Sequence, residues 1–181
     1  MKQGGSKNKG NAFERVIAKQ LSTYFYSDPD ALVRNFNSGG LATMRKGAGL
    51  SPGDIIQVKY LDKTFPYSVE CKHHKKFSLS DLMLENTKST LYKAWVQCKR
   101  DATTLDKIPM LIFKQNFGDV FVVLEGSYLD SLILASYSSY CITKNLTIFK
   151  LDSFLKDTRK LVHEQAINKF EVKVGRLYDA I

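Results

Sequence analysis

The sequence predicts an α/β fold in which a central, mixed β-sheet is flanked by helices. Continuous apolar runs at residues 109–114 and 120–124 are typical of central strands that are covered on both faces. Apolar residues recur at helical spacing over residues 11–25 and 88–102, so these stretches predict amphipathic helices. With 181 residues and 44% hydrophobic content, the chain is long and apolar enough for one domain with its own core.

The charge and the cysteines narrow the class of function. A formal net charge of +9 indicates an anionic partner, with nucleic acid ahead of an acidic membrane surface, although a charged surface also serves solubility alone. The cysteines, Cys71, Cys98 and Cys141, are odd in number and far apart, so they predict neither a disulfide framework nor a zinc module. Because no apolar run could span a membrane and the start is polar, we expect a soluble, cytoplasmic protein.

The N-terminal region is expected to be a tail followed by a helix. Residues 1–10 are rich in Lys, Gly and Asn and offer nothing to bury, so we expect a flexible basic tail before a single domain over residues 11–181. Asn11 is a candidate N-cap for the first helix, and Glu14 lies in its first turn, where acids often complement the helix dipole. We expect the core of the domain over residues 11–124, with an α/β extension after it.

A short strand over residues 31–36 is predicted to run into a glycine-rich turn, Asn37–Gly40. Glycines supply the positive φ angles of any ordinary loop, so the turn does not by itself require a ligand. Residues 41–51 hold too many glycines and basic side chains for a strong element. Within them, Arg45 and Lys46 would suit a loop that faces DNA.

The stretch 52–72 places three ionisable groups at the ends of two predicted strands. Asp54 follows a Pro-Gly turn and opens the first strand. Glu70 and Lys72 lie in the second strand, where alternation puts both on one face. Pairing of the two strands would bring Asp54 beside them, giving two hard oxygen ligands for a divalent cation with an ammonium group nearby. This set suits phosphodiester hydrolysis, and the alternative is a solvated strand face with a small ion pair.

After Lys72 the chain continues with a basic cluster and a helix start. Adjacent histidines, His73 and His74, point to opposite strand faces and cannot easily chelate one ion. We therefore interpret the cluster, with Lys75 and Lys76, as phosphate contact or simple solvation. Ser80 is a candidate cap for a helix that starts at the next residue.

The remainder of the chain predicts a hairpin and a C-terminal extension. The two apolar strands are joined by a turn at residues 116–119, and Lys114 stands at the end of the first. Further elements are expected in this order: a helix over 127–137, a strand over 146–151 and a helix over 152–168. We see no internal repeat and no second-domain boundary.

The pattern Pro52–Gly53–Asp54 followed by Glu70–Cys71–Lys72 resembles the signature of the PD-(D/E)XK nuclease superfamily, a proline-aspartate pair and then acid-any-lysine. The inserted Gly53 departs from the strict pair without moving the aspartate off the strand. A lysine- and glycine-rich start followed by a Phe-Glu pair in the first helix further resembles the archaeal-type Holliday junction resolvases and their phage relatives. The resemblance spans residues 9–124, rests on the order of its motifs and implies a restriction-endonuclease-like core.

The resemblance also implies an activity and a site. It implies a DNA endonuclease that depends on Mg²⁺, with Mn²⁺ as a substitute, and a homodimer, since a resolvase must cut two strands symmetrically. The implied metal ligands are the carboxylates of Asp54 and Glu70 and the backbone carbonyl of Cys71, with Glu14 completing or supporting the site. The implied catalytic residues are Asp54, Glu70, Lys72, Glu14 and Gln97. The alternative for Gln97 is a surface glutamine in a good helix.

The candidate DNA contacts come partly from the resemblance and partly from charge: Arg34, Ser38, Arg45, Lys46, Lys75, Lys76 and Lys114. The expected partner is branched or duplex DNA. Two alternatives stay open: a restriction- or repair-type nuclease on the same core, and a DNA-binding or packaging protein that keeps the fold without cleavage.

Overall fold

The computed structural model describes residues 5–36, 52–125, 140–143 and 145–156. Its elements are α1 (Gly5–Tyr26), β1 (Leu32–Arg34), β2 (Ile55–Gln57), β3 (Tyr67–His74), α3 (Ser80–Met83), α4 (Thr90–Leu105), β4 (Ile108–Gln115), β5 (Val120–Glu125), β6 (Tyr140–Thr143), β7 (Leu146–Lys150) and α6 (Leu151–Lys156). Outside the described residues lie the expected contacts Ser38, Arg45 and Lys46, the helix expected over 127–137 and most of that over 152–168.

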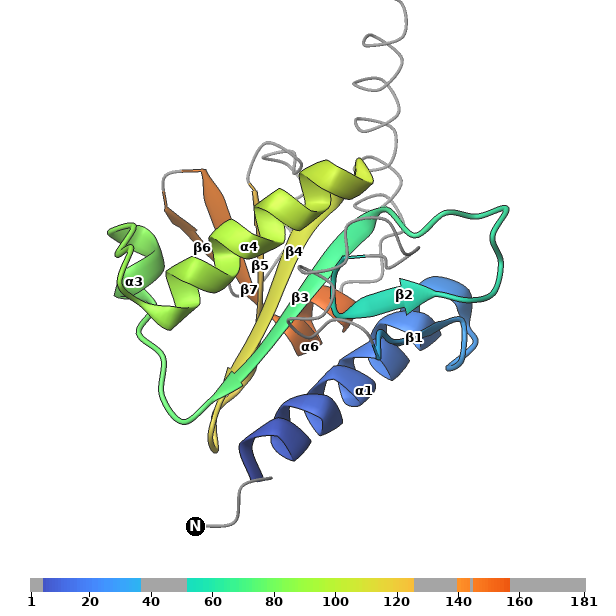
Figure 1. Ribbon diagram of the computed structural model, residues 1–181, viewed down its shortest axis with the longest axis horizontal. Coiled ribbons are helices and arrows are strands. Elements are labelled where there is room, and N and C mark those ends of the chain that lie inside the picture. The colour runs from blue at the N-terminus through green and yellow to red at the C-terminus, as the bar shows by residue number, and fades with distance from the viewer. Residues whose placement is uncertain (1–4, 37–51, 126–139, 144, 157–181) are drawn as a thin grey trace, which may run out of the picture.

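The central feature is a five-stranded sheet with the order β3-β4-β5-β7-β6 (Figure 1). Strands β3 and β4 are parallel, as a crossover through α4 allows, whereas β4–β5, β5–β7 and β6–β7 are antiparallel. The sheet is therefore mixed and flanked by helices, which confirms the predicted α/β fold. The hairpin of β4 and β5 is also confirmed, and β6 is a strand that the sequence did not predict.

Helices cover both faces of this sheet and form two apolar cores. One core contains α1 and α6 residues packed on β3, β4, β5 and β7, including Ile17, Leu21, Val69 and Phe154. The other contains the apolar face of α4, with Trp95 at its centre. Figure 1 shows α4 across one face of the sheet and the β1–β2 pair beside β3, next to α1. Within the described residues, no helix is long and apolar enough to cross a membrane.

The first helix begins earlier than its sequence pattern indicates. It starts at Gly5, so the second half of the expected basic tail belongs to α1, and Asn11 lies inside the helix rather than at its cap. The Asn11 side chain instead accepts a hydrogen bond from Arg34 Nη2 at 2.9 Å. Lys9 helps to stabilise this earlier start of the helix, because its ammonium group donates a hydrogen bond to the Asn116 side chain in the turn between β4 and β5. These tertiary contacts stabilise a helical turn that local propensity alone would not favour.

Two other local predictions are wrong. Strand β2 pairs with β1 in a separate antiparallel sheet and not with β3 as expected. Ser80 does not cap α3: the N-cap position is Leu79, without a side-chain cap bond, and the Ser80 hydroxyl lies 2.6 Å from that of Ser78. The longer helix that follows has a Ser89 cap, whose hydroxyl accepts from the Tyr92 N–H.

Candidate active site

A tight turn holds Asp54 against the edge of β3, which is the outermost strand of its sheet within the described residues. The Asp54 N–H donates to the Val69 carbonyl at 2.8 Å, and one carboxylate oxygen of Asp54 accepts from the Cys71 N–H, also at 2.8 Å. Gly53 has a φ of +90°, a conformation that side-chain-bearing residues rarely adopt. The glycine inserted between Pro52 and Asp54 is therefore what allows the aspartate to reach β3 although its own strand pairs elsewhere.

Asn35 supports this turn from the other side. Its N–H donates to the Asp54 carbonyl at 2.8 Å, and its side-chain amide donates to the Gly53 carbonyl at 2.9 Å. The residue is 3% exposed, so both bonds are formed away from bulk water, where they count most. Sequence reasoning missed Asn35, and the signal available was a polar residue at the end of an apolar strand.

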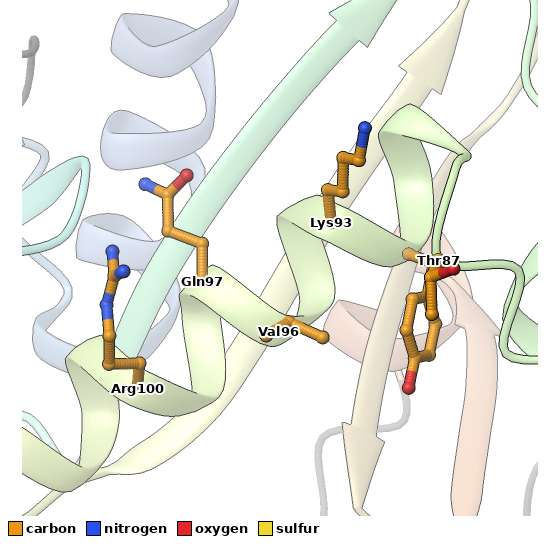
Figure 2. Close-up of a pocket in the computed structure, with 6 residues that line it drawn as sticks. Thr87, Lys93, Val96, Gln97 and Arg100 are labelled. Carbon is orange, nitrogen blue, oxygen red and sulfur yellow. The ribbon is translucent and has the colours of Figure 1, made fainter.

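Glu70 and Lys72 project from the same face of β3, as the alternation predicted. That face is not solvated, because α4 covers it and leaves Glu70 only 2% exposed. The Lys72 ammonium group forms an ion pair with Glu70 Oε1, and Gln97 of α4 donates its amide N–H to Glu70 Oε2 at 3.1 Å. Figure 2 shows Gln97 projecting from α4 on the side where β3 runs. Both oxygens of the Glu70 carboxylate thus have a partner.

Glu70 holds its proton more strongly than an ordinary glutamate. Burial and the nearby Asp54 carboxylate raise the pKa of Glu70 from 4.5 to about 7, and Lys72 offsets only part of this. Burial lowers the pKa of Lys72, but the attraction of Glu70 and Asp54 outweighs it, so the net shift is upward. Lys72 is therefore a protonated ammonium group near neutral pH.

The charges of three carboxylates reach the side chain of Cys71. Burial raises the pKa of the Cys71 thiol well above its ordinary value, and the charges of Asp54, Glu70 and Glu14 raise it further. This places Glu14, which comes from α1, within electrostatic reach of Cys71. The thiol itself is buried and uncharged, so the backbone of Cys71 and not its sulfur is available for chemistry.

Glu14 has its own cation. Arg34 of β1 places Nε 2.5 Å from Glu14 Oε2, and the two side chains are 12% and 13% exposed. The guanidinium group also donates to Asn11 and lies 5.3 Å from the centre of the Phe36 ring. Arg34 thus links α1 to β1, and its Nη1 group has no partner among the described residues.

The donor set fits a hard divalent cation. Two buried carboxylates lie close enough for the charge of Asp54 to raise the pKa of Glu70, and a bound divalent cation would offset this repulsion. The Cys71 N–H points to Asp54 at the edge of β3, and in a strand the carbonyl of the same residue points to the same side. The described residues contain no group of three or more His, Cys, Asp or Glu side chains arranged around one point, so this carbonyl and water would have to complete the coordination.

Other basic residues predicted to contact DNA lie at different places. Lys114 pairs in register with His73, whose ring packs 5.3 Å from Phe13 of α1, so Lys114 is on the face opposite Glu70. Burial lowers the pKa of His73, and the charges of Lys9 and Lys114 lower it further. Lys75 and Lys76 are exposed in the loop after β3. The structure does not bring these lysines to the Glu70 side chain.

The chain is similar in sequence to proteins of bacteriophages. A family described as "Phage putative PDDEXK endonuclease" matches residues 5–173. Protein D14 of Escherichia phage T5 is 32% identical over 75 residues, which cover 41% of this chain and 47% of that protein. The chain thus spans about half the length of this curated relative. No solved structure matches.

Proposed function

Because the chain belongs to this family of phage endonucleases and is thereby a nuclease of the PD-(D/E)XK superfamily, we propose that it cleaves DNA with Mg²⁺, which Mn²⁺ can replace. The observation that carries the proposal is the pair of neighbouring buried carboxylates, Asp54 and Glu70, with the ammonium group of Lys72 paired to Glu70. A purely structural ion pair would not need a second acid. A cation-binding site does.

In this proposal Asp54, Glu70 and the Cys71 carbonyl hold the metal. When bound, Mg²⁺ supplies positive charge to the phosphoryl oxygens and acidifies a water nucleophile. The turn at Gly53 and the Asn35 bonds fix Asp54 at the edge of β3, so the ligand pair is preorganised before substrate arrives.

Lys72 acts through its charge. Since its pKa is raised, it keeps its proton near neutral pH and would orient the water or stabilise the charge that develops on the phosphate, rather than remove a proton. Gln97 would hold Glu70 in its rotamer through the bond to Oε2, which makes it a positioning residue.

Glu14 and Arg34 would act beside this centre. We assign Glu14 to the outer shell of the metal site or to a second cation, because its charge reaches Cys71. The remaining donors of Arg34 would contact a phosphate of the substrate. Lys75, Lys76 and Lys114, together with Ser38, Arg45 and Lys46, are proposed as contacts to more distant backbone.

The proposed substrate is branched DNA, and the proposed assembly is a homodimer. Support comes from the order of motifs shared with Holliday junction resolvases and from the net charge of +9. A dimer would present two sites to the two strands of a junction.

A substrate panel tests the function. Four-way junctions, flaps, linear duplexes and single strands would be incubated with and without Mg²⁺, with Asp54→Asn as the inactive control and Asp62→Asn, an exposed acid in the β2–β3 loop, as the matched control. We expect metal-dependent cutting that is fastest on branched DNA and lost only in Asp54→Asn. Cutting by Asp54→Asn, or none by the wild type on any substrate, would overturn the assignment.

A further inference from the structure

A groove runs along the exposed side of α4, next to the candidate active site. It has a volume of about 400 Å³ and is lined by Thr87, Tyr92, Lys93, Val96, Gln97 and Arg100. This volume lies within the range of small-molecule sites. Among the residues that were given a role above, Gln97 alone lines this groove.

The polar side chains of the groove form a row. Lys93, Gln97 and Arg100 are spaced at i, i+4 and i+7, so they share one face of the helix. Figure 2 shows the three projecting in the same direction, with Gln97 between the two cations. At a rise of 1.5 Å per residue, Lys93 and Arg100 are separated by roughly 10 Å along the helix axis.

The two cations are not neutralised locally. Among the described residues, no acid forms an ion pair with Lys93, and the acid near Arg100 is its sequence neighbour Asp101, at 3.4 Å. The Arg100 side chain is 66% exposed in this pair, so the contact is weak. Two available cations in a row are suited to two anionic groups of one extended ligand.

The groove is continuous with the candidate active site through Gln97. This side chain lines the groove and also donates to Glu70. A ligand that lies between Lys93 and Arg100 therefore passes the residue that holds the buried carboxylate.

The floor of the groove is apolar. Val96 is 46% exposed, and the ring of Tyr92 is only partly buried. A duplex backbone needs charge but offers nothing to an apolar floor, whereas unpaired bases stack on aromatic and apolar side chains. The combination of cations with an exposed apolar side chain and a partly exposed ring is typical of grooves that follow a single strand.

We propose that this groove binds an unpaired segment of the DNA strand beside the scissile phosphate. Lys93 and Arg100 bind its phosphates, and Tyr92 and Val96 contact its bases. This rests on the proposed function and narrows its substrate class to DNA that is single-stranded, or whose strands separate, next to the cleavage site.

Binding without catalysis tests the groove independently of activity. Asp54→Asn protein without metal would be titrated with a forked oligonucleotide that carries single-stranded arms, and with a fully paired duplex of equal length. In the same background, Lys93→Gln/Arg100→Gln should weaken fork binding on the order of tenfold and flatten the slope of log K against log salt by about 1.4, since each single-strand phosphate contributes about 0.7. The same two substitutions should weaken binding of the paired duplex less than binding of the fork.

The matched control is Lys19→Gln/Lys99→Gln, which removes the same charge from exposed lysines of α1 and α4 that do not line the groove. It should leave the preference for the fork unchanged. Val96→Glu adds a negative charge to the groove floor at an exposed position and should weaken the fork complex without lowering the melting temperature.

The outcomes separate the two proposals. The groove proposal would be overturned if Lys93→Gln/Arg100→Gln lost equal affinity for the fork and for the duplex. It would also be overturned if the control Lys19→Gln/Lys99→Gln had the same effect on binding. If the wild type cuts no DNA but the groove variants still lose fork binding selectively, the groove stands and the nuclease assignment fails. If the wild type cuts forks, Lys93→Gln/Arg100→Gln should raise KM for the fork more than it lowers kcat, and unchanged kinetics would count against the groove.

Discussion

Two acid–base pairs lie near the edge of β3, and they differ in what surrounds each acid. Glu70 pairs with Lys72, but burial and the charge of the nearby Asp54 carboxylate raise its pKa to about 7. Glu14 has the guanidinium group of Arg34 to itself, at 2.5 Å. Burial is the larger cause of the Glu70 shift, and Glu70 at 2% is less exposed than the Glu14 side chain at 13%. The two acids also differ in their neighbours, because a second carboxylate lies beside Glu70.

This difference separates two uses of an ion pair. An acid with a dedicated arginine is electrostatically complete and can fix the geometry of neighbouring elements. Two neighbouring buried acids repel each other when both are charged and would gain free energy from a bound cation. The following experiments test whether the two pairs behave differently, beginning with the largest expected effect.

Asp54→Asn and Glu70→Gln should each reduce cleavage to background. The loss should exceed the roughly hundredfold that removal of an outer-shell partner costs, because each change removes a proposed metal ligand. Cleavage rates in Mg²⁺ and melting temperatures would be measured, with Asp62→Asn as the control. Metal-dependent turnover by either variant would remove that residue from the site.

The stability of the metal-free protein should fall as pH rises from about 4.5 to 7, because folded Glu70 retains a proton that the unfolded chain releases. The shift corresponds to about 3 kcal/mol at 1.36 kcal/mol per pKa unit. His73, whose pKa is lowered, contributes in the opposite direction up to about its ordinary pKa of 6.5, but this contribution is common to the wild type and Glu70→Gln. Denaturant unfolding of both proteins at several pH values would isolate the effect of Glu70.

Added Mg²⁺ should stabilise the wild type more at pH 8 than at pH 5, since the metal competes with the proton on Glu70. If the free energies of unfolding of the wild type and Glu70→Gln changed in parallel with pH, the carboxylates of Glu70 and Asp54 would not be coupled as their geometry indicates.

Glu14→Gln should cost on the order of ten- to a hundredfold in activity or metal affinity, as outer-shell losses usually do, and high Mg²⁺ should partly restore it. If Glu14 only complements the helix dipole and Arg34, the change should instead cost at most about 1 kcal/mol of stability. Turnover against Mg²⁺ concentration, with the melting temperature alongside, distinguishes the two. Superimposable activity curves would exclude Glu14 from the site.

Arg34→Gln should flatten the salt dependence of duplex binding by about 0.9 in the slope of log K against log salt, the value for one phosphate contact. The wild-type slope itself should be steep, since a protein of charge +9 releases several counterions. Metal-free binding isotherms at several salt concentrations would give both slopes, with Lys19→Gln as the control. An unchanged slope would limit Arg34 to holding Glu14 in place.

Local patterns predicted much of the fold, and non-local contacts account for what they missed. The alternation along β3 correctly placed Glu70 and Lys72 on one face, because the side-chain period of a strand depends on backbone geometry alone. It could not show that this face is buried, since the covering helix α4 lies many residues later. The β1–β2 pairing and the early start of α1 likewise depend on partners distant in sequence, among them Asn116 for Lys9.

The site was harder to predict than the fold. The motif identified Asp54 correctly as a neighbour of β3, but for the wrong reason, because a glycine turn and not strand pairing brings it there. The ion pair of Glu14 with Arg34 joins residues 20 positions apart and has no local signature. Sequence order indicated which residues to examine, whereas the charge balance around each acid required the structure.

The turn at Asp54 is also expected to limit self-association through the edge of β3. β3 is the outermost strand of its sheet, and unpaired groups on such a strand invite pairing with another chain. Asp54 occupies two of these groups, the Val69 carbonyl and the Cys71 N–H, with its own backbone and side chain. An asparagine keeps an acceptor for the Cys71 N–H, whereas an alanine exposes it, so Asp54→Ala should be more prone to aggregate than Asp54→Asn. A residue assigned to catalysis would thereby also help to keep the protein monodisperse at high concentration.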